Sequence, residues 1–325
     1  MWRARSPVAR PRAGGGGRSD AFSGVRPPAP EAGAPARAKR EARRAGRKAA
    51  RAQRDATRAE REAAGGEREA ARPDRDAQIR EDRRTLQEVR AWLAASTYDA
   101  DGLAVWSKEV DFLRDPVFQR AYGRGIGSGH GFGAGADIHI EWRVHVACWA
   151  GSHAGRLAGD FVECGVNTGI YSLAICDYID LNATGKSFFL FDTFDGIPET
   201  QMHERERERA LEHNRTIYVD VYETARRNFE PFPRAKLIRG RVPDTLDQTP
   251  IDRACYLSLD MNIAEPERAA LEFFWDRLVP GAPVLLDDYA WAGHTLQKEQ
   301  MDDFAASRKV EILTLPTGQG LLLKP

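Results

Sequence analysis

Acidic residues stand where two apolar runs of this chain end. Glu163 closes a run that enters a glycine-bearing turn, GDFVECGVNTG at residues 159–169, and Asp192 closes a second run at 187–191. In open α/β sheets, ligands bind beyond the carboxyl ends of parallel strands, where an acid can take ribose hydroxyls. The two runs therefore predict a nucleoside-binding crevice in which Asp192 holds the ribose.

The turn after the first run offers backbone groups to a ligand. Gly165 has no Cβ and lets the main chain come close, and a helix beginning near Gly169 presents unpaired N–H groups to a carboxylate. A tight turn with a helix-capping acid is the structural alternative. The paired spacing of the two acids and the hairpin at the end of the chain favour a binding site.

Short apolar runs alternate with helical patterns through the body of the chain, which predicts a parallel sheet with helices on both faces. The expected strands lie at residues 160–164, 187–192, 236–239, 255–260 and 283–286. Residues 310–315 and 321–324, on either side of the turn PTGQG, predict an antiparallel hairpin. The fold class is therefore α/β, with a doubly wound, mostly parallel sheet of seven strands. A helix over 141–158 is expected to carry Trp142, Val146 and Trp149 into the core.

The charge of the chain is divided along its length. The whole chain has 48 Lys/Arg and 48 Asp/Glu, but residues 1–80 have 21 and 10, which leaves 27 and 38 for the rest. Residues 1–76 form a basic extension that is expected to be disordered at first and then helix-prone. Without aromatic interleaving, its solvation is favoured over binding to RNA or anionic lipid. The expected location is cytoplasmic, and an organelle transit segment is the less favoured alternative.

Ordered structure is expected to begin near Ala77, with a helical and lid region over 77–140 before the domain at 141–325. A helix that docks on the body is predicted by the apolar residues Ile79, Leu86, Val89, Trp92 and Leu93. The glycine-rich stretch 123–135 is either a lid or a plain linker, and the charged stretch 200–216 is either a substrate-side insertion or a solvated helix. No apolar run is long enough to predict a membrane span, and a homo-oligomer stays open.

The four cysteines at positions 148, 164, 176 and 255 show no spacing of a metal site or a disulfide framework. We therefore expect reduced thiols.

Four motifs in order resemble class I S-adenosylmethionine-dependent methyltransferases, and within them the macrocin-type sugar O-methyltransferases. They are FVECGVNTG, FFLFDTFDGIPE, YLSLDMN and VLLDDY, and the resemblance covers about residues 141–325. Asn167 replaces the usual middle glycine of the cofactor turn, and Asn262 stands where an aspartate-rich form is typical. The resemblance implies a Rossmann-like methyltransferase fold that binds S-adenosylmethionine through Glu163, Cys164, Gly165, Val166, Asn167, Thr168, Gly169, Asp192, Thr193, Phe194, Arg239 and Gly240.

The resemblance also implies a Mg²⁺ site at Asp260, Asp287 and Asp288, whose carboxylates follow the fourth and fifth strands and offer hard oxygens. A substrate hydroxyl bound to the metal loses its proton more easily, so Asp260 is expected to accept that proton while the oxygen attacks the methyl sulfonium. His294 is a second candidate, as a base or for orienting the substrate. The structural alternatives are turn-capping acids and a structural histidine.

The expected function is methyl transfer to a hydroxyl of a small or glycosylated metabolite, assisted by Mg²⁺. One alternative is N-methylation of a nucleic-acid or protein amine, although no Asn/Asp-Pro-Pro-aromatic motif follows the fourth strand. Another is a scaffold protein that has lost catalysis, an interpretation that Asn167 and Asn262 favour. A nicotinamide-dependent oxidoreductase is disfavoured, because no G-x-G-x-x-G turn follows a strand.

Overall fold

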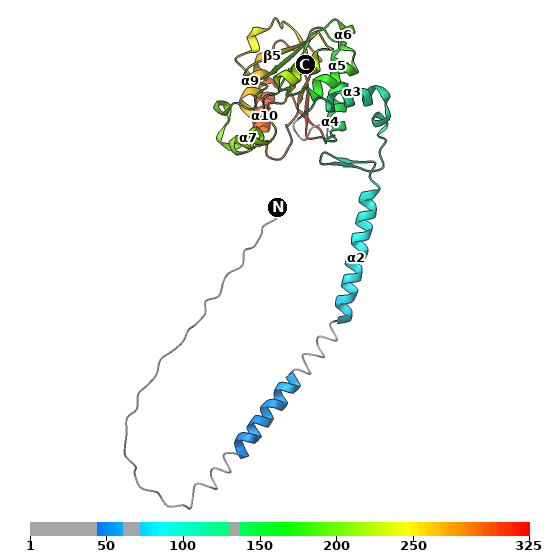
Figure 1. The fold of residues 1–325 in the computed structure, drawn as a ribbon, viewed down its shortest axis with the longest axis vertical. Helices are drawn as coiled ribbons and strands as arrows, with labels where there is room; N and C mark the ends of the chain where they lie inside the picture. The colour runs from blue at the N-terminus through cyan, green and yellow to red at the C-terminus, as the bar shows by residue number, and fades with distance from the viewer. Residues whose placement is uncertain (1–43, 61–71, 131–136) are drawn as a thin grey trace, which may run out of the picture. The chain divides into compact units, whose positions relative to one another are not determined.

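The computed structural model describes residues 44–60, 72–130 and 137–325, and the chain divides into two units, Met1–Gln87 and Glu88–Pro325. In the first unit, residues 44–60 are helical; α2 (Arg72–Ala94) begins in this unit and ends in the second (Figure 1). The expected disorder at the start of the chain lies outside the described residues. The apolar side chains of α2 are exposed, from 40% for Ile79 to 58% for Leu86, so their docking on the body stays a prediction.

A seven-stranded sheet forms the centre of the second unit. Its strands are β3 (Asp160–Cys164), β4 (Phe188–Asp192), β5 (Ala235–Arg239), β6 (Ala254–Leu259), β7 (Pro283–Leu286), β8 (Leu313–Thr314) and β9 (Gly320–Leu323). Their order is β5-β4-β3-β6-β7-β9-β8, and only β9 runs antiparallel to its neighbours β7 and β8. The expected doubly wound, mostly parallel sheet with a terminal hairpin is confirmed. Because the order reverses between β4 and β6, on either side of β3, this is the edge at which a ligand crevice forms.

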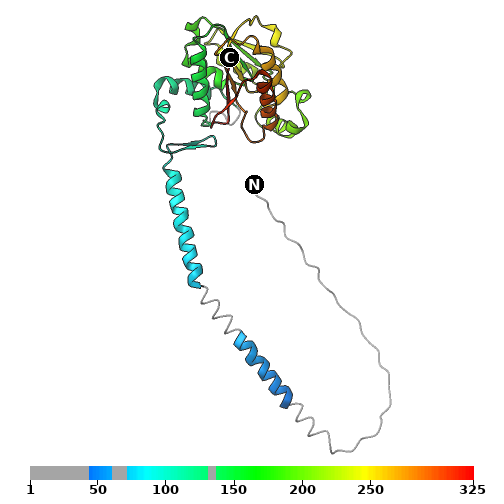
Figure 2. The same cartoon turned by 180° about the vertical axis from the view of Figure 1, so that it is seen from behind.

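Helices cover both faces of this sheet (Figures 1 and 2). The α-helices are α3 (Pro116–Ile126), α4 (Glu141–Ala154), α5 (Ile170–Tyr178), α6 (Leu181–Thr184), α7 (Glu204–Thr216), α8 (Tyr222–Phe229), α9 (Ala264–Trp275) and α10 (Thr295–Arg308). The short 3₁₀ helices are η1 (Asp111–Arg114), η2 (Glu199–Gln201) and η3 (Leu246–Gln248). Neighbouring strand residues serve opposite faces: Phe161 packs in the cluster with α3, α4 and α5, whereas Val162 packs in the cluster with α9 and α10.

The region before the sheet differs from its prediction. Gly123 and Gly125 lie within α3 and not in a loop, because Asp115 caps the helix by accepting the N–H of Val117 and Pro116 starts it. Gly125 is needed for close packing, since a Cβ there would lie 2.4 Å from the carbonyl oxygen of Ile170. The part of the glycine-rich stretch at 131–136 lies outside the described residues.

In α4, the prediction that Trp149 packs into the core was wrong, because its side chain is 49% exposed. The buried side of this helix carries Val144, Ala147 and Cys148 instead. A small hairpin, β1 (Tyr98–Ala100) and β2 (Leu103–Val105), also precedes the sheet and was not predicted. An Asp-Gly pair between two alternating runs is a hairpin signal, so the sequence did contain it.

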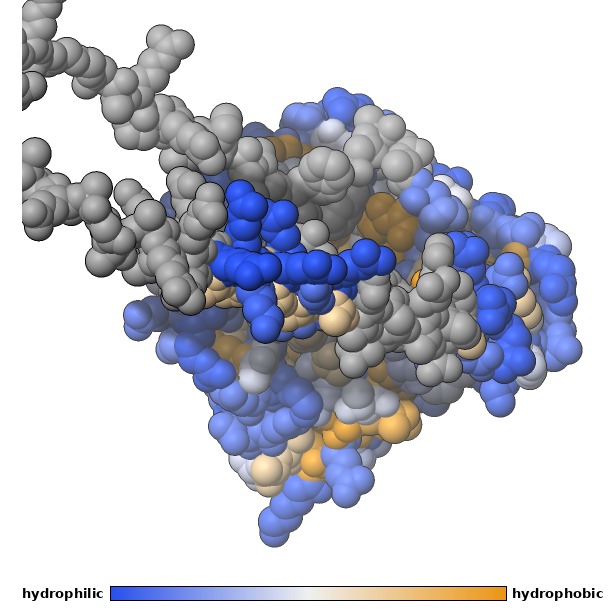
Figure 3. All heavy atoms as spheres, turned by 90° about the horizontal axis from the view of Figure 1, so that it is seen from below, coloured by the Kyte–Doolittle hydropathy of each residue, from blue (hydrophilic) through white to orange (hydrophobic). Residues whose placement is uncertain are grey.

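Hydrophilic side chains cover most of the described surface in Figure 3, and the apolar side chains on that face form small separate patches. Among the described residues, no helix has the length and the hydrophobicity that a membrane span requires. All four cysteines are buried beneath this surface.

Candidate active site

A cavity of about 470 Å³ opens at the carboxyl ends of the parallel strands. It is large enough for a drug-sized ligand or cofactor. The sequence-predicted residues that line it are Glu163, Gly165, Val166, Asn167, Asp192, Thr193, Phe194, Gly240, Asp260, Asp287, Asp288 and His294. The predicted residues that do not line it are Cys164, Thr168, Gly169 and Arg239.

The turn after β3 requires its glycine for a steric reason. Gly165 has a φ of +90°, and a Cβ there would lie 1.9 Å from the backbone oxygen of Asp260. Asn167 follows in the left-handed region with a φ of 50°, which asparagine tolerates better than most residues. The backbone of this turn therefore passes directly against the end of β6.

Asp192 joins the turns that follow β3 and β4. Its Oδ2 accepts the backbone N–H groups of Val166 at 2.6 Å and Asn167 at 2.7 Å. Its Oδ1 accepts the N–H of Phe194 at 2.6 Å. Each carboxylate oxygen has more than one acceptor site, so these bonds leave capacity for a ligand hydroxyl. The acid predicted to hold a ribose thus also fixes the backbone around it.

Three of the predicted residues outside the lining have structural contacts instead. Cys164 is fully buried in the sheet. Thr168 is also buried, and its hydroxyl lies 2.8 Å from that of Ser128. Arg239 lies over the ring of Tyr222, at 4.7 Å from the ring centroid, and its Nη2 is 3.6 Å from Asp220 Oδ1.

Beyond β6 and β7 the cavity is acidic, with Asp260, Asp287 and Asp288 in its lining. Burial raises the pKa of Asp260 well above its ordinary value, and the neighbouring charges of Asp287 and Asp288 raise it further. Burial and the charge of Asp287 likewise raise the pKa of Asp288. The nearby Glu267 is buried as well, and burial followed by the charge of Asp288 raises its pKa to about 8. Carboxylates in such surroundings either hold protons or attract a cation.

Asp287 and Asp288 differ in their contacts. Asp287 Oδ1 accepts from the Tyr171 hydroxyl at 2.7 Å and from Gln319 Nε2 at 3.0 Å, and its Oδ2 accepts from Arg143 Nη1 at 2.8 Å. Asp288 Oδ2 is buried and accepts no hydrogen bond from the described residues. Asp287 is therefore engaged by three donors within the protein, whereas the nearby group at Asp288 Oδ2 is His294 Nδ1, 3.1 Å away.

Arg143 is a site residue that the sequence analysis missed. It extends from α4 and donates to Asp101 from Nε at 2.8 Å and from Nη2 at 3.0 Å, in addition to its bond with Asp287. Burial acts to lower its pKa, but the neighbouring Tyr171 and the carboxylates of Asp287 and Asp101 outweigh this, and its pKa is raised. The only signal in the sequence is a single arginine among the apolar residues of EWRVHVACWAG.

His294 lies near Asp288 and Arg209. Its Nδ1 is 3.1 Å from an oxygen of Asp288 and 2.6 Å from Gln297 Oε1, and its ring contacts the guanidinium of Arg209. Burial, followed by the charge of Arg209, lowers the pKa of His294 to about 4. A histidine with this pKa is neutral at pH 7 and a weak base, so its position suits orientation of a neighbouring group.

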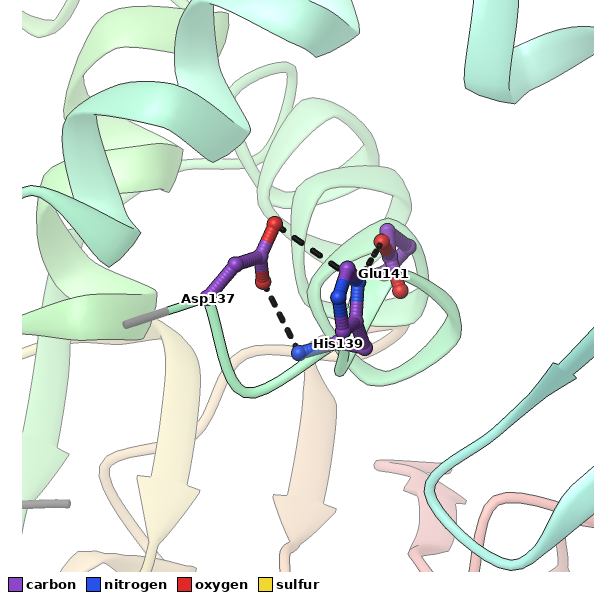
Figure 4. Close-up of side chains that lie close together, drawn as sticks. All are labelled: Asp137, His139 and Glu141. Atoms are coloured by element: carbon purple, nitrogen blue, oxygen red, sulfur yellow. Dashed lines mark hydrogen bonds and ion pairs between the residues drawn. The ribbon is translucent and has the colours of Figure 1, made fainter. Parts of the chain in front are cut away.

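A group of Asp137, His139 and Glu141 lies at the start of α4, whose first residue is Glu141 (Figure 4). Among the described residues it is the group of three whose potential ligand atoms all lie within 4.8 Å of one another; the predicted set of Asp260, Asp287 and Asp288 does not form one. The hydroxyls of Tyr122 and Tyr98 donate to Asp137 and Glu141, and His139 Nδ1 lies 3.1 Å from Glu141. The carboxylates here are already bonded, and they fix the start of α4.

The chain is similar in sequence and in structure to known O-methyltransferases. A family model described as macrocin-O-methyltransferase (TylF) matches residues 146–314. The 8-demethyl-8-(2,3-dimethoxy-alpha-L-rhamnosyl)-tetracenomycin-C 4'-O-methyltransferase of Streptomyces olivaceus is 34% identical over 145 residues, or 42% of this chain and 55% of that protein. The chain thus spans about half the length of this curated relative. The structure of the O-methyltransferase NovP is similar in fold, with a TM-score of 0.54 and 21% identity over 66% of this chain and 97% of that one.

Proposed function

Because the chain belongs to the macrocin-O-methyltransferase family, whose model matches residues 146–314, we propose that it transfers a methyl group from S-adenosylmethionine to a hydroxyl group. The substrate named for the S. olivaceus relative carries a rhamnosyl group, which supports a small glycosylated acceptor. The observation that carries the proposal is a single cavity that contains both the Asp192-organised turns and the carboxylates beyond β6 and β7.

Buried polar atoms beside β3 support the methyl donor. Glu163 Oε2 and Asn167 Oδ1 are buried and have no hydrogen-bond partner among the described residues. A buried polar atom without a partner costs free energy, so a polar ligand that bonds to it is favoured. The amino acid and ribose portions of S-adenosylmethionine offer such groups, and Gly165 gives them access to the backbone.

The carboxylates beyond β6 and β7 fit a divalent cation. Hard oxygen donors suit Mg²⁺, and Asp260 and Asp288 are the residues that would hold it, since Asp288 Oδ2 accepts no hydrogen bond from the described residues. When bound, Mg²⁺ supplies positive charge that makes a neighbouring hydroxyl more acidic. We include Mg²⁺ assistance in the proposed function.

Asp260 is the proton acceptor that we propose for the acceptor hydroxyl. Its Oδ1 accepts from Asn262 Nδ2 at 3.2 Å, which leaves Oδ2 for the proton. His294 is the weaker candidate for this role, because burial and the charge of Arg209 lower its pKa to about 4. The apolar lining residues Ile197 and Ile263 reduce access of water to the reacting groups.

The asparagines that favoured a catalytically inactive scaffold have a conformational explanation. Asn167 has a φ of 50° and Asn262 a φ of 62°, and both lie in turns at the ends of buried strands. Asparagine is one of the few side chains other than glycine that adopts this region readily. Their presence therefore does not require a loss of catalysis.

Calorimetric titration of S-adenosylmethionine into the full-length protein, with and without Mg²⁺, tests the proposal. We expect micromolar binding that weakens by about tenfold or more in Asp192→Asn, because this variant loses charge-assisted hydrogen bonds to two turns. Asp252→Asn, an exposed change before β6, is the matched control and should bind normally. Absence of binding in every condition would overturn the proposal. Once binding is found, transfer of an isotope-labelled methyl group from S-adenosylmethionine is measured with two kinds of acceptor. Transfer to glycosides with free hydroxyls, but not to amino-sugar analogues, would identify oxygen as the acceptor atom.

A further inference from the structure

The β1–β2 hairpin reaches the acidic side of the cavity with its tip. Asp101 and Gly102 form the turn with φ values of 53° and 70°, and Asp101 lines the cavity. Gly102 lies against Trp291, since a Cβ there would be 3.6 Å from the indole ring. The tip is therefore part of the site, although it lies far from the other lining residues in the sequence.

Arg143 connects this tip to the carboxylates. Its guanidinium binds Asp101 in a two-pronged contact and binds Asp287 through its remaining nitrogen, and the side chains of all three residues are mostly buried. The same guanidinium lies 5.3 Å from the ring centroid of Trp291. One buried guanidinium thus forms ion pairs with two carboxylates that are 186 positions apart in the sequence.

The position of Arg143 is fixed from the start of its helix. The Tyr98 hydroxyl donates to Glu141 Oε2 at 2.9 Å, and the carbonyl oxygen of His139 lies 3.1 Å from the same hydroxyl. The Tyr122 hydroxyl donates to Asp137 and accepts the N–H of Ile140. These bonds around the group in Figure 4 fix the start of α4, from whose first turn Arg143 extends.

We propose that Arg143 is a positioning residue that acts as a built-in cation: it withholds Asp287 from a divalent metal and thereby limits the metal affinity of the site. Asp101 offsets part of the charge of Arg143 and so moderates this effect. The inference rests on the proposed metal site at Asp260 and Asp288. Its basis is that Asp287 has three donors within the protein, whereas Asp288 Oδ2 accepts no hydrogen bond from the described residues and lies 3.1 Å from His294 Nδ1.

Removing the charge of Arg143 and removing the charge of Asp101 should have opposite effects on the Mn²⁺ affinity. Arg143→Gln removes a buried positive charge beside the metal site and frees Asp287, so Mn²⁺ should bind about tenfold more tightly. Asp101→Asn removes the negative charge that offsets Arg143, so Mn²⁺ should bind about threefold or more weakly. Arg143→Lys keeps the charge and should stay within about threefold of the wild type.

The experiment is a titration of Mn²⁺ alone into the full-length protein, with free Mn²⁺ measured by electron paramagnetic resonance. Arg120→Gln is the matched control, because Arg120 pairs with Asp177 on the surface and should leave Mn²⁺ affinity unchanged. Thermal melting of each variant reports on folding. If Arg143→Gln fails to fold, Asp101→Asn decides: weaker binding at an unchanged melting temperature supports the inference, and unchanged or tighter binding overturns it.

If the contacts of Arg143 with Asp101 and Asp287 only stabilise the fold, the variants should show a different pattern of Mn²⁺ affinities. In that case both Arg143→Gln and Asp101→Asn would weaken Mn²⁺ binding, and the inference would be wrong while the proposed function stands. Absence of Mn²⁺ binding in all variants would overturn both the inference and the metal part of the proposed function. Binding of S-adenosylmethionine, measured on the same samples, then shows whether the methyl-donor part is retained.

Discussion

Backbone amides of two turns shape the cavity beside β3 and β4, whereas charged side chains from distant elements shape it beyond β6 and β7. We call the first the turn side (residues 163–169 and 192–194) and the second the charged side, which comprises Asp101, Arg143, Arg209, Asp260, Asp287, Asp288 and His294. On the turn side one carboxylate organises three backbone N–H groups. On the charged side, Arg143 joins two elements that no turn connects. The turn side should therefore be most sensitive to backbone changes, and the charged side to changes of charge.

Gly165→Ala is the change expected to have the largest effect on the turn side. The new Cβ would lie 1.9 Å from the backbone oxygen of Asp260 in a left-handed conformation. We expect the free energy of unfolding to fall by about 3 kcal/mol or more, and S-adenosylmethionine binding to be lost. Chemical denaturation and calorimetry measure these effects.

Gly185→Ala is the matched control for this change. Gly185 has a φ of +76°, but nothing lies within 4 Å of its Cβ position. It should cost about 1 kcal/mol from conformational strain alone. Equal losses of stability in the two variants would contradict a rigid turn side.

The variants Arg209→Met and Arg205→Met show how much a partly buried arginine and an exposed arginine, one turn apart on α7, each contribute to stability. Arg209 Nη2 donates to the carbonyl of Asn262 at 3.0 Å, and the same guanidinium contacts His294. Its loss leaves the carbonyl unpaired and should lower the free energy of unfolding by about 2 kcal/mol. Arg205 pairs with Glu299 on the surface, and its loss should change stability much less. Denaturant titration of both variants checks this, and an equal response would mean that the charged side does not depend on Arg209.

The same contrast explains how much of the site could be predicted. Asp192 ends β4, and the amides that it binds, 25 and 26 positions away, lie in the turn after the adjacent strand β3, so the apolar runs and the glycine turn were enough to bring them together. Asp287 and Arg143 are 144 positions apart, and no periodicity connects them. The Asp-Gly pair indicated a hairpin at residues 101–102, but not that its tip would reach Arg143. The fold followed from alternating runs, whereas the cofactor role of Arg239 stays a prediction, because a strand end alone does not fix where a long side chain points.

Stability on the charged side should depend on pH. Glu267 is buried with a pKa of about 8, so at pH 6 to 7 it is protonated when folded and ionised when unfolded. The folded state then binds one more proton, and stability falls as pH rises towards 8, by about 1 kcal/mol between pH 6 and 7 for this group. The raised pKa of Asp288 acts in the same direction.

Glu267→Gln is the variant that isolates this dependence. It keeps the shape of the side chain and an acceptor for the N–H groups of Met261 and Asn262. Unfolding curves at several pH values should therefore show a shallower decline than in the wild type. A decline of the same slope would assign the titration to other groups. Added Mg²⁺ should oppose the decline in the wild type, because a bound cation favours ionised carboxylates.

Tyr98→Phe is the change expected to have the smallest effect on the charged side. The change removes the hydroxyl that bonds Glu141 and the carbonyl of His139, and it should lower the free energy of unfolding by about 1 kcal/mol. Because Tyr98 lies at the base of the hairpin and Asp101 at its tip, the variant separates support of the hairpin from the charge of its tip. We expect S-adenosylmethionine affinity to be unchanged, since the turn side has its own contacts. If the affinity for S-adenosylmethionine fell together with stability, the turn side and the charged side would be coupled through α4. The two sides would then differ only in how far apart their residues lie in the sequence.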